Sequence, residues 1–113
     1  MEKEKINFED FDKIEFRLGI IKECFKHPNA DRLLVFKVDI GEEKTRQIIS
    51  SISEFYKPED VIYKRVVVVA NLKKAIFRGM ESDGMLMCAS LPNDEDVELL
   101  TITKDFKAGS IIN

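Results

Sequence analysis

The 113-residue sequence contains no tryptophan, one histidine and two cysteines. No apolar run approaches the roughly 18 residues that a membrane-spanning helix needs. The segment Met1–Lys5 carries acidic residues and lacks the hydrophobic stretch of a signal peptide. Cys24 and Cys88 stand alone without a C-x-x-C spacing, as is typical of reduced thiols. The sequence therefore predicts a cytoplasmic protein with no membrane partner.

Residues of the kinds that build catalytic and metal sites are also scarce. His27 precedes Pro28 in a loop and has no second histidine with which to share a metal ion. The sequence has no glycine-rich phosphate loop, no Cys/His cluster and no supportable Ser/His/Asp arrangement. We therefore expect neither enzymatic activity nor a cofactor.

What is present is typical of one folded domain spanning residues 1–113. The chain is 44% apolar and 35% charged, and its length is sufficient for a single core. Its net charge is −3 and its pI about 5.3, which argues weakly against a nucleic-acid partner. Electrostatic attraction depends, however, on where the charge lies as well as on the total.

Alternating apolar residues predict short strands. In residues 14–20 the alternation places Arg17 outward, and in residues 33–40 it places Lys37 outward. The residues expected to face the core are Ile14, Phe16, Leu18 and Ile20 in the first segment, and Leu34, Phe36, Val38 and Ile40 in the second. Gly19, in mid-strand, suggests a bulge or a sharp bend. Before the first strand, Phe8 and Phe11 are expected to pack against the body of the domain.

Three further segments, residues 45–50, 65–70 and 85–89, complete a set of five strands. Ser53–Tyr56 is helix-like and interrupts the series after the third strand. The order β-β-β-α-β-β predicts an all-β OB-fold, a five-stranded Greek-key barrel used for nucleic acids and oligosaccharides. The barrel is expected to end near residue 90. Residues 91–113 then form an apolar extension, for which a second copy of the chain in a homodimer is the simplest cover.

The stretch Arg65–Ala89 carries the most information about function. Between Val61 and Met80 there are five Lys or Arg residues and no Asp or Glu, so this block is +5 and the remainder is −8. Ser82-Asp83-Gly84 has the composition of a hairpin turn. The acidic residues Asp94–Asp96 and Glu98 are interpreted as a solvated loop away from any RNA site. The segregation of charge predicts a cationic surface on an acidic protein.

Four motifs resemble the tRNA-binding domain family, and they occur in the family's order and spacing. They are His27-Pro28-Asn29-Ala30-Asp31-Arg32-Leu33, Arg46-Gln47-Ile48-Ile49-Ser50, Val67-Val68-Val69-Ala70-Asn71-Leu72-Lys73 and Arg78-Gly79-Met80-Glu81-Ser82-Asp83-Gly84-Met85. The resemblance covers about residues 7–113. This chain departs from the family pattern at Ser51 and Tyr63, where glycine is usual or frequent, and at Lys73–Arg78, where a Pro-Arg pair is common.

The resemblance implies an OB-fold module like those that occur alone or at the C-terminus of bacterial methionyl-tRNA synthetases. It implies a homodimer whose C-terminal tail contributes to the interface, and recognition of the folded shape of tRNA without choice of one anticodon. An aminoacyl-tRNA synthetase is a possible second partner. Asn71, Ser82 and Met85 are expected on the RNA surface by the same resemblance.

The residues themselves suggest how such a surface would work. Lys73, Lys74 and Arg78 are expected to contact phosphates, with Arg17 and Lys37 as further contributors, and Phe77 to stack on an exposed base or to pack internally. Five neutralised phosphates would give a slope of log K against log salt of roughly −3.5 to −4.5. Three alternatives remain: an ordinary solvated loop, a protein-interaction module like the export-related chaperones that share this barrel, and a general single-strand binder.

Overall fold

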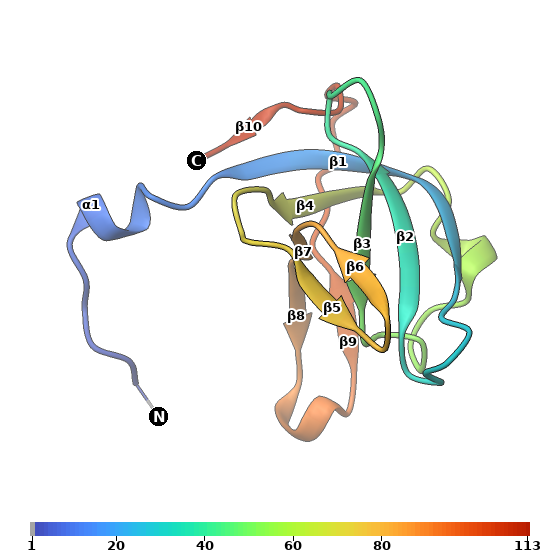
Figure 1. Ribbon diagram of the computed structural model, residues 1–113. Coiled ribbons are helices and arrows are strands. Elements are labelled where there is room, and N and C mark those ends of the chain that lie inside the picture. Colours follow the sequence, from blue (N-terminus) through green and yellow to red (C-terminus); the bar gives the residue numbers. More distant parts are fainter. Residues whose placement is uncertain (1) are drawn as a thin grey trace.

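The computed structural model describes residues 2–113, which form a small β-barrel with little helix (Figure 1). The helical elements are short: α1 (Phe8–Phe11) and the 3₁₀ turns η1 (Pro58–Asp60) and η2 (Pro92–Asp94). The strands are β1 (Phe16–Lys26), β2 (Leu34–Asp39), β3 (Arg46–Ser50), β4 (Arg65–Val69), β5 (Ala75–Phe77), β6 (Met80–Ser82), β7 (Met85–Leu86), β8 (Cys88–Ser90), β9 (Val97–Leu99) and β10 (Ile111–Ile112). Within this part of the chain no helix has the length and apolar character to cross a membrane.

The main sheet has the strand order β3-β2-β1-β4-β7, and all its pairs are antiparallel. Because β4 returns to lie beside β1, this order is a Greek key. The free edge of β3 is closed by the chain between β6 and β7: the Asp83 amide donates to the Gln47 carbonyl at 2.8 Å, and the Ile49 amide donates to Ser82 Oγ at 2.9 Å. The expected OB-fold barrel is confirmed.

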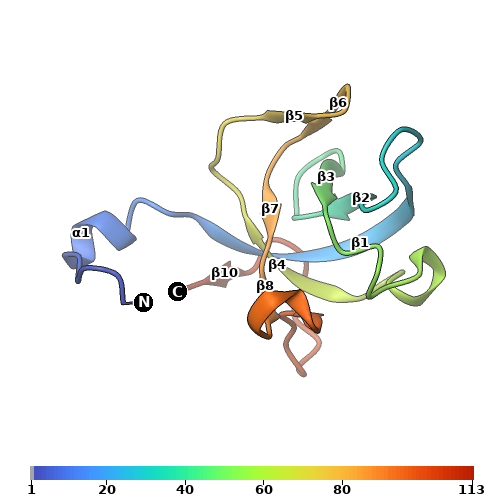
Figure 2. The same cartoon turned by 90° about the horizontal axis from the view of Figure 1, so that it is seen from below.

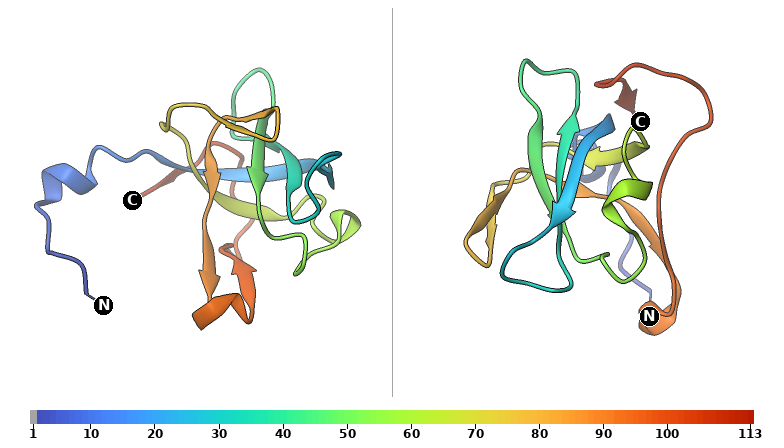
Figure 3. Two further views of the ribbon diagram at one scale, coloured as in Figure 1. Left: turned by 60° about the horizontal axis from the view of Figure 1, so that its bottom comes forward. Right: turned by 90° about the vertical axis from the view of Figure 1, so that its right-hand side faces the viewer.

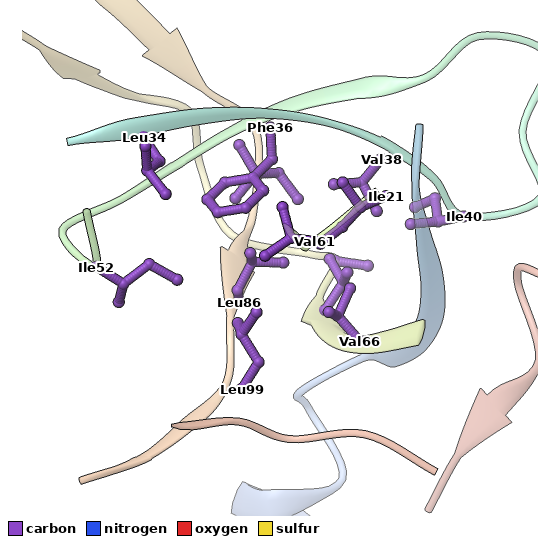
Figure 4. Packing of buried hydrophobic residues seen from close by; sticks show 13 residues of the cluster. Ile21, Leu34, Phe36, Val38, Ile40, Ile52, Val61, Val66, Leu86 and Leu99 are labelled. Carbon is purple, nitrogen blue, oxygen red and sulfur yellow. The ribbon is translucent and has the colours of Figure 1, made fainter. Parts of the chain in front are cut away.

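The core lies inside this barrel around Phe36, which is fully buried (Figure 4). The alternation in β2 is confirmed, because Leu34, Phe36, Val38 and Ile40 all belong to the core cluster. Leu99 belongs to it as well, so the segment after residue 90 continues the hairpin of β8 and β9 and helps to fill the barrel. The apolar character of this segment is therefore partly explained within one chain.

The expected inner face of β1 is wrong by one residue. A Cβ atom on Gly19 would lie 2.5 Å from a Val38 methyl group and 3.0 Å from one of Val68, so Gly19 faces the barrel interior. Ile21 belongs to the core cluster, whereas Leu18 is buried outside it. At this position the C-terminal segment pairs with the edge of β1: the Leu18 amide donates to the Ser110 carbonyl at 2.9 Å, and the Gly109 amide donates to the Leu18 carbonyl at 2.8 Å. The register irregularity lies between Ile21 and Glu23 rather than at Gly19.

The connection between β3 and β4 differs from the short helix expected there. Residues 53–56 form a turn, in which the Phe55 and Tyr56 amides donate to the Ile52 carbonyl, and η1 follows. The residue before a proline is disfavoured in the α region, and Lys57 is accordingly extended, with φ −88° and ψ 144°. Pro58 therefore prevents the turn from continuing as a helix.

The N-terminal arm, residues 2–14, extends away from the barrel, and only its base, from Phe11 on, shares a depression with residues 111–113 (Figure 1 and Figure 2). Phe8 and Phe11 are 69% and 43% exposed, so the expectation that both pack against the body is wrong, although the Phe11 ring lies 6.0 Å from that of Phe16. Asn71 fixes the base of the arm: its Oδ1 accepts from the Glu15 amide at 2.8 Å and its Nδ2 donates to the Lys13 carbonyl at 2.6 Å.

Tyr63 has a left-handed backbone conformation, with φ +66°. Such a conformation costs a residue with a Cβ atom about 1–2 kcal/mol relative to glycine. Glycine, which the resemblance leads us to expect at this position, would avoid that cost. The Tyr63 ring is exposed, and Lys22 Nζ lies 5.5 Å from its centroid.

We predict that Tyr63→Gly is more stable than Tyr63→Ala by about 0.5–1 kcal/mol, because relief of backbone strain outweighs the greater entropy of unfolded glycine. Both variants lose the contact with Lys22, so their difference isolates the backbone effect. Urea denaturation measures it. Equal stability of the two variants would show that the left-handed backbone is not strained.

Candidate nucleic-acid interface

A hairpin projects from the barrel between β4 and β7, in the segment that was expected to be a basic loop (Figure 3). Phe77 pairs with Met80, and the two residues between them, Arg78 and Gly79, have φ of +52° and +88°. Positive φ at both positions is characteristic of a type I′ turn, which matches the twist of a hairpin. The tight turn is therefore Arg78-Gly79, and the expectation of a hairpin turn at Ser82-Asp83-Gly84 is wrong.

Polar contacts fix the hairpin of β5 and β6 on the outer face of the sheet. Gln47 Nε2 donates to the Glu81 carbonyl at 2.8 Å. His27 Nε2 lies 2.8 Å from the Phe77 carbonyl oxygen. The hairpin is thus attached to the sheet at β3 and at the end of β1.

A groove of about 570 Å³ runs beneath the tip of this hairpin. Its walls include Arg32 from the β1–β2 loop, Phe77 from β5, Met85 from β7, and the hydroxyl-bearing residues Ser50, Ser51 and Ser90. The loop after the first barrel strand and the loop after the fourth frame the ligand face of OB-folds in general. The groove therefore lies where an OB-fold binds an extended ligand.

Two of the predicted contact residues meet in this groove. Phe77 is 40% exposed and Met85 is 50% exposed, and both line its wall. An aromatic ring and a thioether side by side offer an apolar surface on which a base can stack. The groove lining also contains two carboxylates, those of Glu54 and Asp94.

The predicted cations Lys73, Lys74 and Arg78 are all exposed. Lys74 lines a depression separate from the groove, together with Lys44, Arg46 and the carboxylates of Glu42, Glu43, Glu81 and Asp83. Arg65, at the opposite end of β4, pairs with Asp105 at 2.9 Å. The charge block seen in the sequence is therefore divided in space and partly neutralised.

Four other predicted contact residues are engaged within the protein. Arg17 donates to Glu15 at 2.8 Å and to the Gly109 carbonyl at 3.1 Å, and Lys37 donates to Gln47 at 2.6 Å. The Asn71 amide holds the N-terminal arm, as described above. Ser82 is 3% exposed, and its hydroxyl donates to the Gly84 carbonyl while accepting from Ile49. Their hydrogen bonds serve the fold.

Arg46 anchors the base of the same connection. Its guanidinium donates to both oxygens of Glu42, at 2.9 and 2.8 Å, and to the Ala70 carbonyl at 2.6 Å. These hydrogen bonds lower the pKa of Glu42 and raise that of Arg46. The pair stays ionised and joins the β2–β3 turn to the end of β4.

The remaining reactive groups are inert. Burial raises the pKa of Cys24 to about 12 and also raises the pKa of Cys88, so both thiols stay protonated at neutral pH. Among residues 2–113, no three His, Cys, Asp or Glu side chains are grouped so that they could hold a metal ion.

Arg32 is the groove residue that the sequence reasoning missed. Its side chain is 81% exposed and lies 3.3 Å from Glu54, an exposed pair of little energetic value. Arg32 belongs to the motif at residues 27–33, but nothing in the local sequence shows that this loop lies opposite Phe77. Only the fold brings them together.

Comparison with known proteins agrees with this geometry. A family model described as "Putative tRNA binding domain" matches residues 16–111. Methionine–tRNA ligase of Pyrococcus horikoshii is 44% identical over 109 residues, 96% of this chain, and that of Listeria monocytogenes is 48% identical over 87 residues, 77% of this chain. This chain spans 15% and 13%, respectively, of the length of those two relatives.

Solved structures of small proteins match over nearly their whole length. A methionyl-tRNA-synthetase-related protein from Pyrococcus horikoshii has a TM-score of 0.89 and 28% identity, with 97% of this chain and 99% of that one covered. The chaperone CsaA from Bacillus anthracis has a TM-score of 0.86 and 27% identity, with 97% and 100% covered. Because the family model spans most of the barrel and the tail, and the ligase relatives exceed 40% identity, this chain belongs to the putative tRNA-binding domain family.

Proposed function

We propose that this protein is a non-catalytic, cytoplasmic tRNA-binding module that acts as a homodimer and recognises the folded shape of tRNA rather than its sequence. The family match supports the partner, and the groove between Arg32, Phe77 and Met85 supports the place of contact. Because the ligase relatives carry the matching segment as a small part of their length, delivery of tRNA to a methionyl-tRNA synthetase is the role we propose for it.

The groove suits an unstacked nucleotide of a folded RNA. Sequence-specific readout of RNA requires hydrogen bonds to base edges, whereas stacking and backbone contacts tolerate any sequence. The exposed groups here include a ring, a thioether, hydroxyls, a guanidinium, the Asn93 amide and the carboxylates of Glu54 and Asp94. Stacking on the ring and the thioether favours shape over base identity.

The distribution of charge around the groove would restrict the path that the RNA backbone takes. Arg32 and Arg78 are exposed on the side of the β5–β6 hairpin, where Arg32 also lies 3.3 Å from Glu54. Asp94 and the acidic residues beside it lie at the tip of the β8–β9 hairpin, at the opposite end (Figure 1). Phosphates are repelled by that acidic end. The backbone would therefore run along the β5–β6 hairpin and leave the groove away from η2.

The structure also lowers the expected number of phosphate contacts. Of the five cations first considered, Arg17 and Lys37 are hydrogen-bonded within the protein and Lys74 lines a depression separate from the groove. Lys73, Arg78 and Arg32 remain. Three phosphates per binding site give a slope of log K against log salt of roughly −2 to −3.

We predict that Arg32→Ala weakens binding of folded bulk tRNA and makes the salt slope shallower by about one unit. Phe77→Leu, which keeps an apolar side chain but loses the ring, is expected to weaken binding by about 1 kcal/mol or more with an unchanged slope. A fluorescence titration at several salt concentrations measures both effects.

Lys104→Ala is the matched control, because it removes one exposed positive charge from the tail on the opposite side of the barrel (Figure 3). Competition by single-stranded RNA and duplex DNA tests shape recognition. Competition by unstructured RNA as effective as that by folded tRNA would favour a general single-strand binder. No binding of tRNA at low salt would refute the proposal.

A protein-interaction module is the alternative that a specific observation favours. The CsaA structures have the same barrel and match this chain over nearly all their length. Their identity of 26–27% is lower than the 44–48% of the ligase segments over the aligned residues. Suppression of aggregation of an unfolded protein, together with absence of tRNA binding, would support this alternative.

The homodimer is supported by apolar side chains left uncovered at one end of the molecule. They come from the N-terminal arm and from β10 beside the start of β1. The exposed members are Ile6, Phe8, Phe11, Ile14 and Ile111, each at least 40% exposed. Phe8 and Ile111 are both 69% exposed. Because large apolar side chains exposed together are costly in water, this favours their burial against a second chain.

We predict that the wild-type protein sediments as a dimer at micromolar concentration and that the double variant Phe8→Asp, Ile111→Asp sediments as a monomer, because charged groups at both positions oppose burial of the arm. Tyr63→Asp, which places the same charge at another exposed apolar site, is expected to stay dimeric. A wild-type monomer in analytical ultracentrifugation would contradict the homodimer.

A further inference from the structure

The motif at residues 27–33 supplies Arg32 to the groove, but its first residue, His27, does not line the groove. His27 is 4% exposed, and it and Ser82 are the two buried polar side chains among residues 2–113. A buried imidazole needs partners for its ring nitrogens. His27 has one for each.

These partners determine which nitrogen carries the hydrogen. The Asn29 amide donates to His27 Nδ1 at 3.0 Å, so Nδ1 must be an unprotonated acceptor. Nε2 therefore carries the hydrogen and donates to the Phe77 carbonyl oxygen at 2.8 Å. The neutral ring satisfies both contacts, one within its own loop and one to a hairpin fifty residues away in the sequence.

The loop itself is held from the other side. Ser53 Oγ donates to the Asp31 carbonyl at 2.6 Å, and the Ser53 amide donates to the Arg32 carbonyl at 3.3 Å. The His27 amide donates to the Leu33 carbonyl at 3.0 Å and closes the base of the loop. Arg32 is thus carried by a loop whose backbone is fixed, and the contact from His27 to Phe77 joins this loop to the hairpin.

We propose that His27 is a positioning residue that clasps the β5–β6 hairpin to the β1–β2 loop and thereby sets the separation of Phe77 from Arg32 across the groove. The consequence of this inference for tRNA binding rests on the proposed function. Its structural part, the clasp, concerns the free protein.

Two conservative variants separate the two hydrogen bonds. In His27→Asn the side-chain oxygen takes the place of Nδ1, so the contact with the Asn29 amide is kept as an Asx-type turn while the reach to Phe77 is lost. In His27→Gln the side-chain nitrogen takes the place of Nε2 and donates to the Phe77 carbonyl. A residue needed only to fill space would make the two variants equivalent.

Amide hydrogen exchange by NMR in the free protein tests the clasp. In His27→Asn the hairpin amides of residues 75–82 are expected to exchange about tenfold faster, whereas in His27→Gln they stay within about threefold of wild type. The dissociation constant for folded tRNA is expected to follow the same pattern. Equal exchange in both variants, or unchanged tRNA affinity in a variant with a loosened hairpin, would overturn the proposal.

The two proposals fail in different ways. If wild-type protein binds no tRNA, the proposed function fails, and hydrogen exchange still decides the clasp. If neither variant folds, the imidazole ¹⁵N spectrum of the wild type decides: an Nε2–H tautomer is expected, and an Nδ1–H tautomer would overturn the inference.

Discussion

The seam between β3 and the chain that joins β6 to β7 is the constraint on which the rest of the structure depends. An open strand edge leaves backbone groups without partners. Here the Asp83 amide and the Ser82 hydroxyl satisfy the groups of Gln47 and Ile49 and close the barrel around Phe36. The residues that make these contacts, Ser82 and Asp83, lie at the end of the β5–β6 hairpin. The hydrogen bonds that close the core therefore also position this hairpin.

The candidate groove and the apolar end of the molecule, formed by the N-terminal arm and β10, are separate surfaces of the closed barrel. The right-hand view of Figure 3 shows the β5–β6 hairpin on one side of the barrel and the C-terminal tail on the other. Phe77 and Met85 lie on the first side, and Ile111 lies on β10 with the tail. A dimer formed through the arm and β10 would therefore leave both grooves open to RNA.

The sequence predicted most of the barrel, because burial on one face of a strand produces alternation, as in β2. It failed for β1 since Leu18 is buried outside the core cluster, and Gly19 has no side chain to signal the inner face. The motifs identified the family, but the cations of the predicted basic loop, Lys73, Lys74 and Arg78, do not line the candidate groove. Arg65 pairs with Asp105 from a distant segment, and Lys74 lines a separate depression. The buried Ser82 hydroxyl bonds to β3, and Arg32 reaches the groove from a loop that only the fold places there.

The most direct test of this account is to map the tRNA contact by NMR, recording amide and methyl shifts of the labelled protein as folded bulk tRNA is added. The account predicts that the perturbed signals concentrate in residues 27–33 and 75–85, including the Met85 methyl group, while those around Lys64 and Lys104 stay unchanged. Perturbations centred on the depression around Lys74, or on the tail, would contradict the assignment of the groove as the RNA-binding surface.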